Sequence, residues 1–142
     1  MNKFWGHLKT ITHHRHLVMR GCFRMGLIWQ GLTHDLSKYS PTEFLAGVRY
    51  YQGDRSPNTA EREANGYSLA WMHHKGRNRH HFEYWTDLSP KTRTYEPVDM
   101  PVRYLCEMVA DRIAACKTYQ GAAYTDASPL QYLDRANESR LV

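Results

Sequence analysis

The sequence predicts an all-α protein, folded as a single compact helical bundle of about five main helices. Apolar residues recur at three- and four-residue steps through several segments, which is the spacing of one helix face. Pro and Gly stand where helices start and stop, and no stretch alternates apolar and polar residues as a strand would. We expect one domain over residues 1–142, with a tail at 134–142 that frays.

Three helices are expected in the N-terminal half of the chain. Residues 3–24 form the first, whose apolar stripe consists of Phe4, Leu8, Ile11, Val18 and Cys22. The second follows Gly26, and Gly31 within it suits close helix packing. Its inward residues are expected to be Leu27, Ile28, Leu32 and Leu36. The third begins at residues 40–43, an S-x-x-E capping box with Pro at the first helical position, and ends near Gln52.

The C-terminal half is expected to add two helices around a long loop. Residues 53–63 favour a loop with a helical restart at Ser56-Pro57, and a fourth helix covers 67–75. Residues 76–100 hold too many turn formers for one helix, so we expect an ordered loop with short helical pieces, a kind of loop that often carries function.

The last clear helix is expected to be capped by Asp99, with Pro101 at its first position. Its main apolar stripe consists of Val102, Leu105, Val109, Ile113 and Cys116. A second stripe consists of Tyr104, Met108, Asp111 and Ala115. A helix that is apolar on two faces is central, so Asp111 would be drawn into the interior.

Composition and charge limit the classes of partner and location. The net charge is +5, which favours an anionic partner such as a nucleotide, a phosphoester, a nucleic acid or an acidic surface, and equally fits an ordinary basic protein. The three cysteines form no CxxC pair, so we expect small core residues in a reducing cytoplasm. The first residues lack the apolar core of a signal peptide, and no run reaches the roughly 18 apolar residues of a membrane helix.

Histidines and acidic residues carry the strongest functional signal. His14 lies on the flank of the first apolar stripe, and the adjacent pair His34 and Asp35 ends the second helix. Burying an isolated carboxylate costs several kcal/mol unless it is paired or bound to a cation. One divalent cation would remove that cost for Asp35 and Asp111 together, and helical bundles build metal sites from side chains on facing helices. The predicted metal ligands are His14, His34, Asp35, His74, His80 and Asp111.

The order His, His-Asp, His, His, Asp on helices resembles the HD-domain superfamily of metal-dependent phosphohydrolases. The residues that carry the resemblance are His14, the "HD" at 34–35 and Asp111 in "EMVADRIAA". The "HH" pairs at 73–74 and 80–81 are similar to the extra histidines of members that hold two metals. Lys38 in "HDLSK" is similar to the HD-x-x-K pattern of some members.

More closely, "GLTHDLSKYSPTEF" with "HHKGRNRHHFEYW" resembles a small, uncharacterised bacterial and phage family related to the HD fold. The resemblance extends from about His14 to Asp111 and implies an HD-like fold that binds one or two metal ions. Imidazole and carboxylate ligands suit Mn, Fe, Co, Ni or Zn. The superfamily includes phosphohydrolases, nucleases, iron-dependent oxygenases and inactive members, so the fold alone does not fix the reaction.

Several assignments stay open in the sequence. The interval from His14 to His34 is shorter than is usual in the superfamily, so the first ligand could be His13 or His16 in another helix phase. Adjacent histidines on a helix point about 100° apart. We favour His74 over His73 because it lies closer to the helix end.

The second pair and the last carboxylate also keep alternatives. Loop geometry could aim both His80 and His81 inward. Asp111 could instead be the buried salt-bridge partner of Arg112 or Arg15.

The function that these residues predict is hydrolysis of a nucleotide or another small phosphoester by a metal-activated water. Catalytic roles are predicted for Lys38, His73 and His81, and substrate-binding roles for Arg15, Lys75, Arg77 and Arg79. The alternatives are an HD-type di-iron oxygenase, a basic nucleic-acid binder, and a non-catalytic nucleotide-binding module. No membrane partner is expected.

Overall fold

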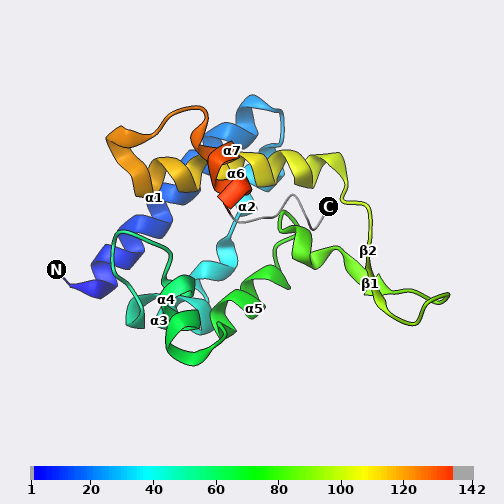
Figure 1. The fold of residues 1–142 in the computed structure, drawn as a ribbon. Coiled ribbons are helices and arrows are strands. Elements are labelled where there is room, and N and C mark those ends of the chain that lie inside the picture. The colour runs from blue at the N-terminus through cyan, green and yellow to red at the C-terminus, as the bar shows by residue number, and fades with distance from the viewer. Residues whose placement is uncertain (1, 136–142) are drawn as a thin grey trace.

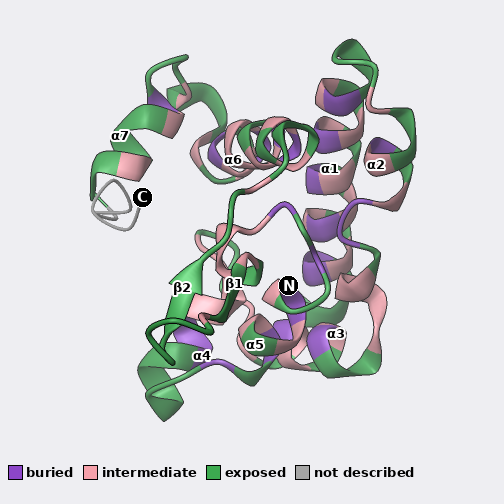
Figure 2. Cartoon of the chain, turned by 90° about the vertical axis from the view of Figure 1, so that its right-hand side faces the viewer, coloured by how far each residue is buried: buried purple, intermediate pink, exposed green. Residues whose placement is uncertain are grey.

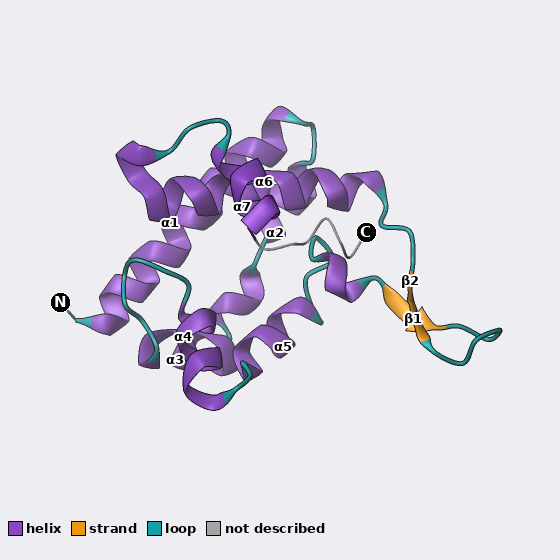
Figure 3. Ribbon diagram, in the orientation of Figure 1, coloured by secondary structure: helices purple, strands orange, loops and turns teal. Residues whose placement is uncertain are grey.

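The computed structural model describes residues 2–135, and most of them are helical (Figures 1 and 3). The α-helices of this part are α1 (Lys3–Arg24), α2 (Ile28–Thr33), α3 (Pro41–Arg49), α4 (Pro57–Asn65), α5 (Leu69–Lys75), α6 (Val102–Gln120) and α7 (Ser128–Arg135). Short 3₁₀ helices are η1 (Leu36–Tyr39), η2 (Phe82–Tyr84) and η3 (Gly121–Ala123). Two strands, β1 (Thr86–Leu88) and β2 (Tyr95–Pro97), pair antiparallel.

The two long helices α1 and α6 form the centre of the fold. Their contact holds a cluster of buried residues, Val18, Cys22, Ala110 and Ala114. The helices approach closely because Gly21 carries no side chain, and a Cβ there would lie only 3.2 Å from the Cβ of Ala110. One face of α1 is buried (Figure 2). Histidines lie on it, and its buried residues are Gly6, His7, Ile11, His14, Val18 and Cys22.

A second group of short helices lies beside the N-terminal half of α1. In this group α3 contacts α1, α4 and α5 (Figure 1). A cavity of about 540 Å³ opens between the two groups, with walls from α1, α4, α5 and α6. The fold therefore surrounds one cavity with polar side chains from helices that are distant in the sequence.

Several expected boundaries are confirmed. The first helix covers the predicted residues 3–24. The helix predicted to have Pro101 at its first position begins one residue later, at Val102. Ser56 caps α4 by accepting a hydrogen bond from the backbone N–H of Asn58, as the restart signal predicted. Gly31 packs tightly, since a Cβ there would lie 3.0 Å from the ring of Phe23.

Two helix caps were predicted wrongly. Ser40 takes the N-cap position of α3 and Pro41 opens the helix, as predicted, but the Ser40 side chain makes no cap hydrogen bond, and the helix ends at Arg49. Glu43 does not complete a capping box because it binds histidines of α5 instead. Asp99 does not cap α6, whose cap residue is Pro101.

One element was longer than predicted, and two were missed. The predicted restart at Ser56-Pro57 opens a full helix over residues 57–65, where we expected a loop with only a restart. The loop 76–100 holds the expected short helix η2 but also the hairpin β1–β2, whose strands of three exposed residues are too short to show alternation. Residues 128–135 add α7, so the described chain has more than five main helices. Most of the predicted frayed tail, 136–142, lies outside the described residues.

The expected inward faces of two helices were also wrong. Val102 and Val109 of the predicted main stripe of α6 are 72% and 47% exposed. Ile28 and Leu32 of α2 are about half exposed. On α6 the inner face is neither predicted stripe: it holds Glu107, Ala110 and Ala114, and the two alanines are small enough to allow α1 to approach. Over residues 2–135, no helix combines the length and the apolar character that crossing a membrane requires.

Candidate metal centre

Four predicted ligands meet where α1, the end of α2 and α6 converge. We call this group position A; it consists of His14, His34, Asp35 and Asp111. Nε2 of His14 lies 2.9 Å from Oδ1 of Asp111. Nε2 of His34 lies 3.3 Å from Oδ2 of Asp35 and 3.4 Å from Oδ1 of Asp111. Two imidazole nitrogens and two carboxylates thus face one point.

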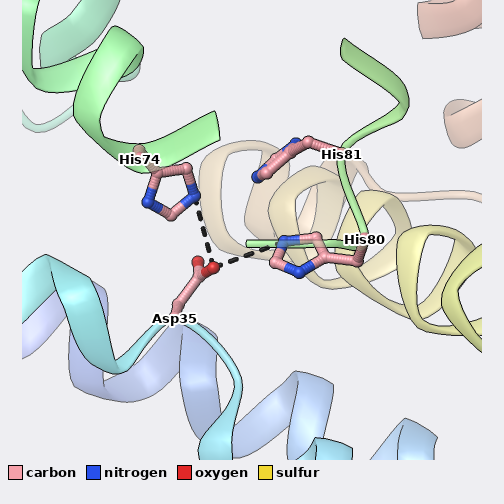
Figure 4. A group of neighbouring side chains, drawn as sticks. All are labelled: Asp35, His74, His80 and His81. Carbon is pink, nitrogen blue, oxygen red and sulfur yellow. Dashed lines mark ion pairs between the residues drawn. The ribbon is translucent and has the colours of Figure 1, made fainter. Parts of the chain in front are cut away.

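A second group lies on the other side of Asp35, and we call it position B. It consists of Asp35, His74, His80 and His81 (Figure 4). Oδ1 of Asp35 lies 3.3 Å from Nε2 of His74 and 3.3 Å from Nε2 of His80. The ring of His81 packs on that of His80, with 4.2 Å between their centroids. Asp35 therefore offers one oxygen to each position.

The donor atoms of both positions fit a cation. Three imidazole nitrogens, Nε2 of His34, His80 and His81, are buried and have no hydrogen-bond partner within residues 2–135. Oδ1 of Asp35 is in the same condition. Buried polar atoms nearly always have partners, so a cluster of orphaned ones that face each other fits a bound cation. Nitrogen and carboxylate oxygen are donors that transition metals accept, so these groups could hold a metal ion.

The backbone at Asp35 is shaped for this shared role. Its φ is +54°, a left-handed conformation that Asp tolerates better than most residues, and its side chain is almost fully buried. Arg15 fixes the preceding turn, because its guanidinium donates hydrogen bonds to the carbonyl oxygens of Leu32 and His34. Nζ of Lys38 lies 2.6 Å from Oδ2 of Asp35.

Two buried glutamates orient the imidazoles from behind. Oε1 of Glu107 lies 2.8 Å from Nδ1 of His34 and 3.2 Å from Nδ1 of His80. Glu43 receives Nδ1 of His74 at 2.6 Å and Nδ1 of His73 at 2.7 Å. A neutral imidazole that donates from Nδ1 keeps its lone pair on Nε2, so these contacts direct Nε2 toward the two positions.

The charges of the cluster shift its titrations strongly. Burial alone would raise the pKa of Asp35, but the charges of His34 and Lys38 outweigh it and hold that pKa well below its usual range. Burial opposes the charged form of His80, yet its contacts with Asp35 and Glu107 raise its pKa to about 9. In Glu107, hydrogen bonds from the two imidazoles overcome burial and lower the pKa to about 2. Without a metal ion, the carboxylates therefore favour protons on His34, His74 and His80, whereas burial lowers the pKa of His14 and His81.

The structure brings together all six residues that were predicted as ligands. His81, predicted to act in proton transfer, lies within position B. His73 lies outside both positions and contacts Glu43. The alternatives His13 and His16 are exposed on α1, whereas His14 is buried.

The basic residues that were predicted to bind substrate lie elsewhere. In the described chain, Arg15, Lys75, Arg77 and Arg79 do not line the cavity. Arg77 donates to the carbonyl oxygen of His73, and Arg79 to the hydroxyl of Tyr104. The cationic residues that do line the cavity are Lys38, Arg55, Arg62 and Arg112.

Sequence reasoning missed the two glutamates. Glu107 precedes Asp111 by one helical turn, so the i, i+4 spacing could have placed it on the same face. Glu43 was explained as part of a capping box, which hid its second possible role. Nothing in the sequence marked Arg55 and Arg62, because no motif ties α4 to the cavity.

The fold and this centre define a mostly helical protein with a buried His and Asp cluster that could hold a metal ion. The chain belongs to DUF5662, a family of unknown function whose model matches residues 3–141. Comparison with curated proteins and with solved structures gave no match.

Proposed function

We propose that the protein is an HD-like, metal-dependent phosphohydrolase that acts on a nucleotide or another small phosphoester in the cytoplasm. The observation that carries this proposal is the pair of ligand groups that share Asp35, beside a cavity whose lining includes Lys38, Arg55 and Arg62. Two ligand groups that share one carboxylate would suit the pair of ions that two-metal hydrolysis of phosphoesters uses.

In this proposal the side chains of positions A and B hold one or two divalent ions of Mn, Fe, Co, Ni or Zn. Such ions supply an activated water and neutralise charge on the phosphoryl oxygens. His81 serves as a ligand, and His73 holds Glu43 in place.

The cavity walls supply the rest of the substrate contacts. Lys38 lies between the metal positions and the open cavity, so its ammonium can offset charge on a phosphoryl oxygen. Arg55 and Arg62 line the wall formed by α4 and its preceding loop. The Arg55 guanidinium already donates to Glu63 and Gln52, so Arg62 is the arginine of this wall that is proposed to bind the substrate. Guanidinium groups bind phosphate through two parallel hydrogen bonds, which suits an anionic substrate. A cavity of about 540 Å³ is the size that small-molecule ligands occupy.

A second candidate is an HD-type di-iron oxygenase. The observation that favours it is the nitrogen-rich donor set of position B, in which three histidines accompany one carboxylate. Histidine and carboxylate sets of this kind also suit non-haem iron. Metal content and dependence on oxygen separate the two reactions.

The test is elemental analysis of the protein purified without a histidine tag, with a panel of phosphoesters assayed on the same sample. We expect transition metal at one to two equivalents and phosphate release that a chelator abolishes. Substrate turnover that requires oxygen and iron would replace the hydrolase by the oxygenase. Protein that neither retains nor takes up transition metal would refute both.

A further inference from the structure

Glu107 occupies a place in this centre that no other residue shares in the described chain. One of its oxygens, Oε1, contacts Nδ1 of His34 at 2.8 Å and Nδ1 of His80 at 3.2 Å. His34 belongs to position A and His80 to position B. The two rings lie 4.3 Å apart between centroids. A single buried carboxylate therefore stands behind one ligand of each position.

If Glu107 moved with one imidazole ring, its Oε1 would lose contact with the other ring. Its second oxygen, Oε2, accepts a hydrogen bond of 2.7 Å from Nε2 of Gln30. Gln30 is held in turn, because the same amide nitrogen donates to the carbonyl oxygen of Arg103 at 3.0 Å. Glu107 itself is 5% exposed, so no water replaces a lost contact easily. A shift of either ring is thus passed through Oε1 to the other ring.

We propose that Glu107 is a positioning residue that links the two metal positions, so that its loss weakens metal binding at both. This inference rests on the proposed metal centre and adds to it the route by which positions A and B affect each other. A residue that orients one metal ligand commonly changes affinity by about 10- to 100-fold when it is replaced. Replacement of a residue that orients one ligand of each position should therefore lower the metal affinity of both positions.

Glu43 provides the matched control. It is also a buried glutamate that holds an imidazole by Nδ1, at 2.6 Å, but that imidazole, His74, belongs to position B alone. Its second contact is with His73, which is a ligand of neither position. The two glutamates therefore differ in how many metal positions each one supports.

The experiment titrates Co²⁺ into metal-free protein and follows the visible absorption of the bound ion together with calorimetry. We expect two binding steps in the unmodified protein. Glu107→Gln should weaken both steps by about 10-fold or more, because the neutral amide is a weaker acceptor and its NH₂ faces the NH₂ of Gln30. Glu43→Gln should weaken one step and leave the other unchanged.

A second, milder variant tests the same link in case Glu107→Gln does not fold. Gln30→Leu leaves every ligand and both glutamates in place but removes the hydrogen bond to Oε2. It should weaken both steps by a smaller factor while the circular dichroism spectrum stays helical. If Glu107→Gln or Gln30→Leu changes only one step, the link is refuted while the metal centre stands. If the unmodified protein binds no Co²⁺, the metal centre itself is refuted.

Discussion

Positions A and B share Asp35 but are built from different kinds of structure. Position A draws His14 and Asp111 from α1 and α6, the two longest helices of the described chain, which pack through a core of small side chains. Position B draws His74 from the short helix α5, and His80 and His81 from the turn that follows it (Figure 4).

This difference shows how each position is kept in place. Long packed helices fix the direction of a ligand through the core, so His14 and Asp111 need few polar supports. The ligands of position B depend on hydrogen bonds, since Asn78 donates to the carbonyl oxygen of His74 and Glu43 holds its ring. We therefore expect His14 and Asp111 of position A to be preformed, whereas His34 and the ligands of position B depend on their polar surroundings.

The largest effect should come from the residue that the positions share. Asp35→Asn keeps a side chain that tolerates the left-handed backbone but removes the charge that faces both positions. We expect the loss of both metal equivalents and a fall in phosphoester hydrolysis of at least about a hundredfold. Elemental analysis and the assay measure this. If the variant keeps one full equivalent of metal, one of the two positions binds its ion without the Asp35 carboxylate.

Removal of a ligand from one position should separate the two. His14→Ala removes a ligand that only position A uses, and His81→Ala one that only position B uses. At saturating metal, we expect each variant to lose one of two equivalents. His13→Ala is the control, because His13 is exposed beside His14 and should leave metal content unchanged. If His14→Ala loses both equivalents, the positions are not separable structures and the comparison fails.

The same difference explains how much of the site could be predicted from the sequence. His14 was found because it lies on the flank of an apolar stripe that does face inward. Asp111 was found because α6 carries two apolar stripes and was therefore expected to be central, although its most buried face is a third one. His80 and His81 lie outside any helix, so no periodicity told which of them points to the centre. The structure turns both inward, which a turn can do and a helix cannot.

The errors in the fold have a related cause. Val102 and Val109 look like core residues by hydrophobicity, yet the inner face of α6 holds Ala110 and Ala114. Close contact with Gly21 of α1 selects small side chains there, and that contact is between segments far apart in the chain. A pattern within one segment cannot reveal which face a distant helix will meet. Glu43 was misread for the same reason, since its partners lie about thirty residues away.

The supports of position B should appear in the pH dependence of stability. In metal-free protein the pKa of His80 is raised to about 9, so the folded state holds this proton more tightly than the unfolded chain does. The stabilisation is complete below about pH 6.5, the usual pKa of histidine, and is lost as the pH rises through 9. We expect the free energy of unfolding to fall by up to about 3 kcal/mol over this range.

Denaturant unfolding of chelated protein between pH 6 and 10 measures this loss. Saturating metal should flatten the profile, because a metal ion replaces the protons on the imidazoles. His80→Gln is the control and should reduce the slope. A chelated protein with constant stability over this range would contradict the proposed charge balance of the cluster.

The smallest expected effect is on substrate binding. It is tested by replacing one arginine of α4 and one of the turn that forms position B. Arg62 lines the cavity, whereas Arg79, between the ligand-bearing histidines, binds Tyr104 outside it. Because Arg62 is exposed and solvated, its contact with an anionic substrate should be modest. Arg62→Ala should raise KM for a phosphoester by about 3- to 10-fold with kcat nearly unchanged, since it binds the ground state and the transition state alike. Arg79→Ala should change neither constant. The opposite result, with KM raised only by Arg79→Ala, would mean that the substrate contacts the turn of position B and that Arg62 of α4 does not bind it.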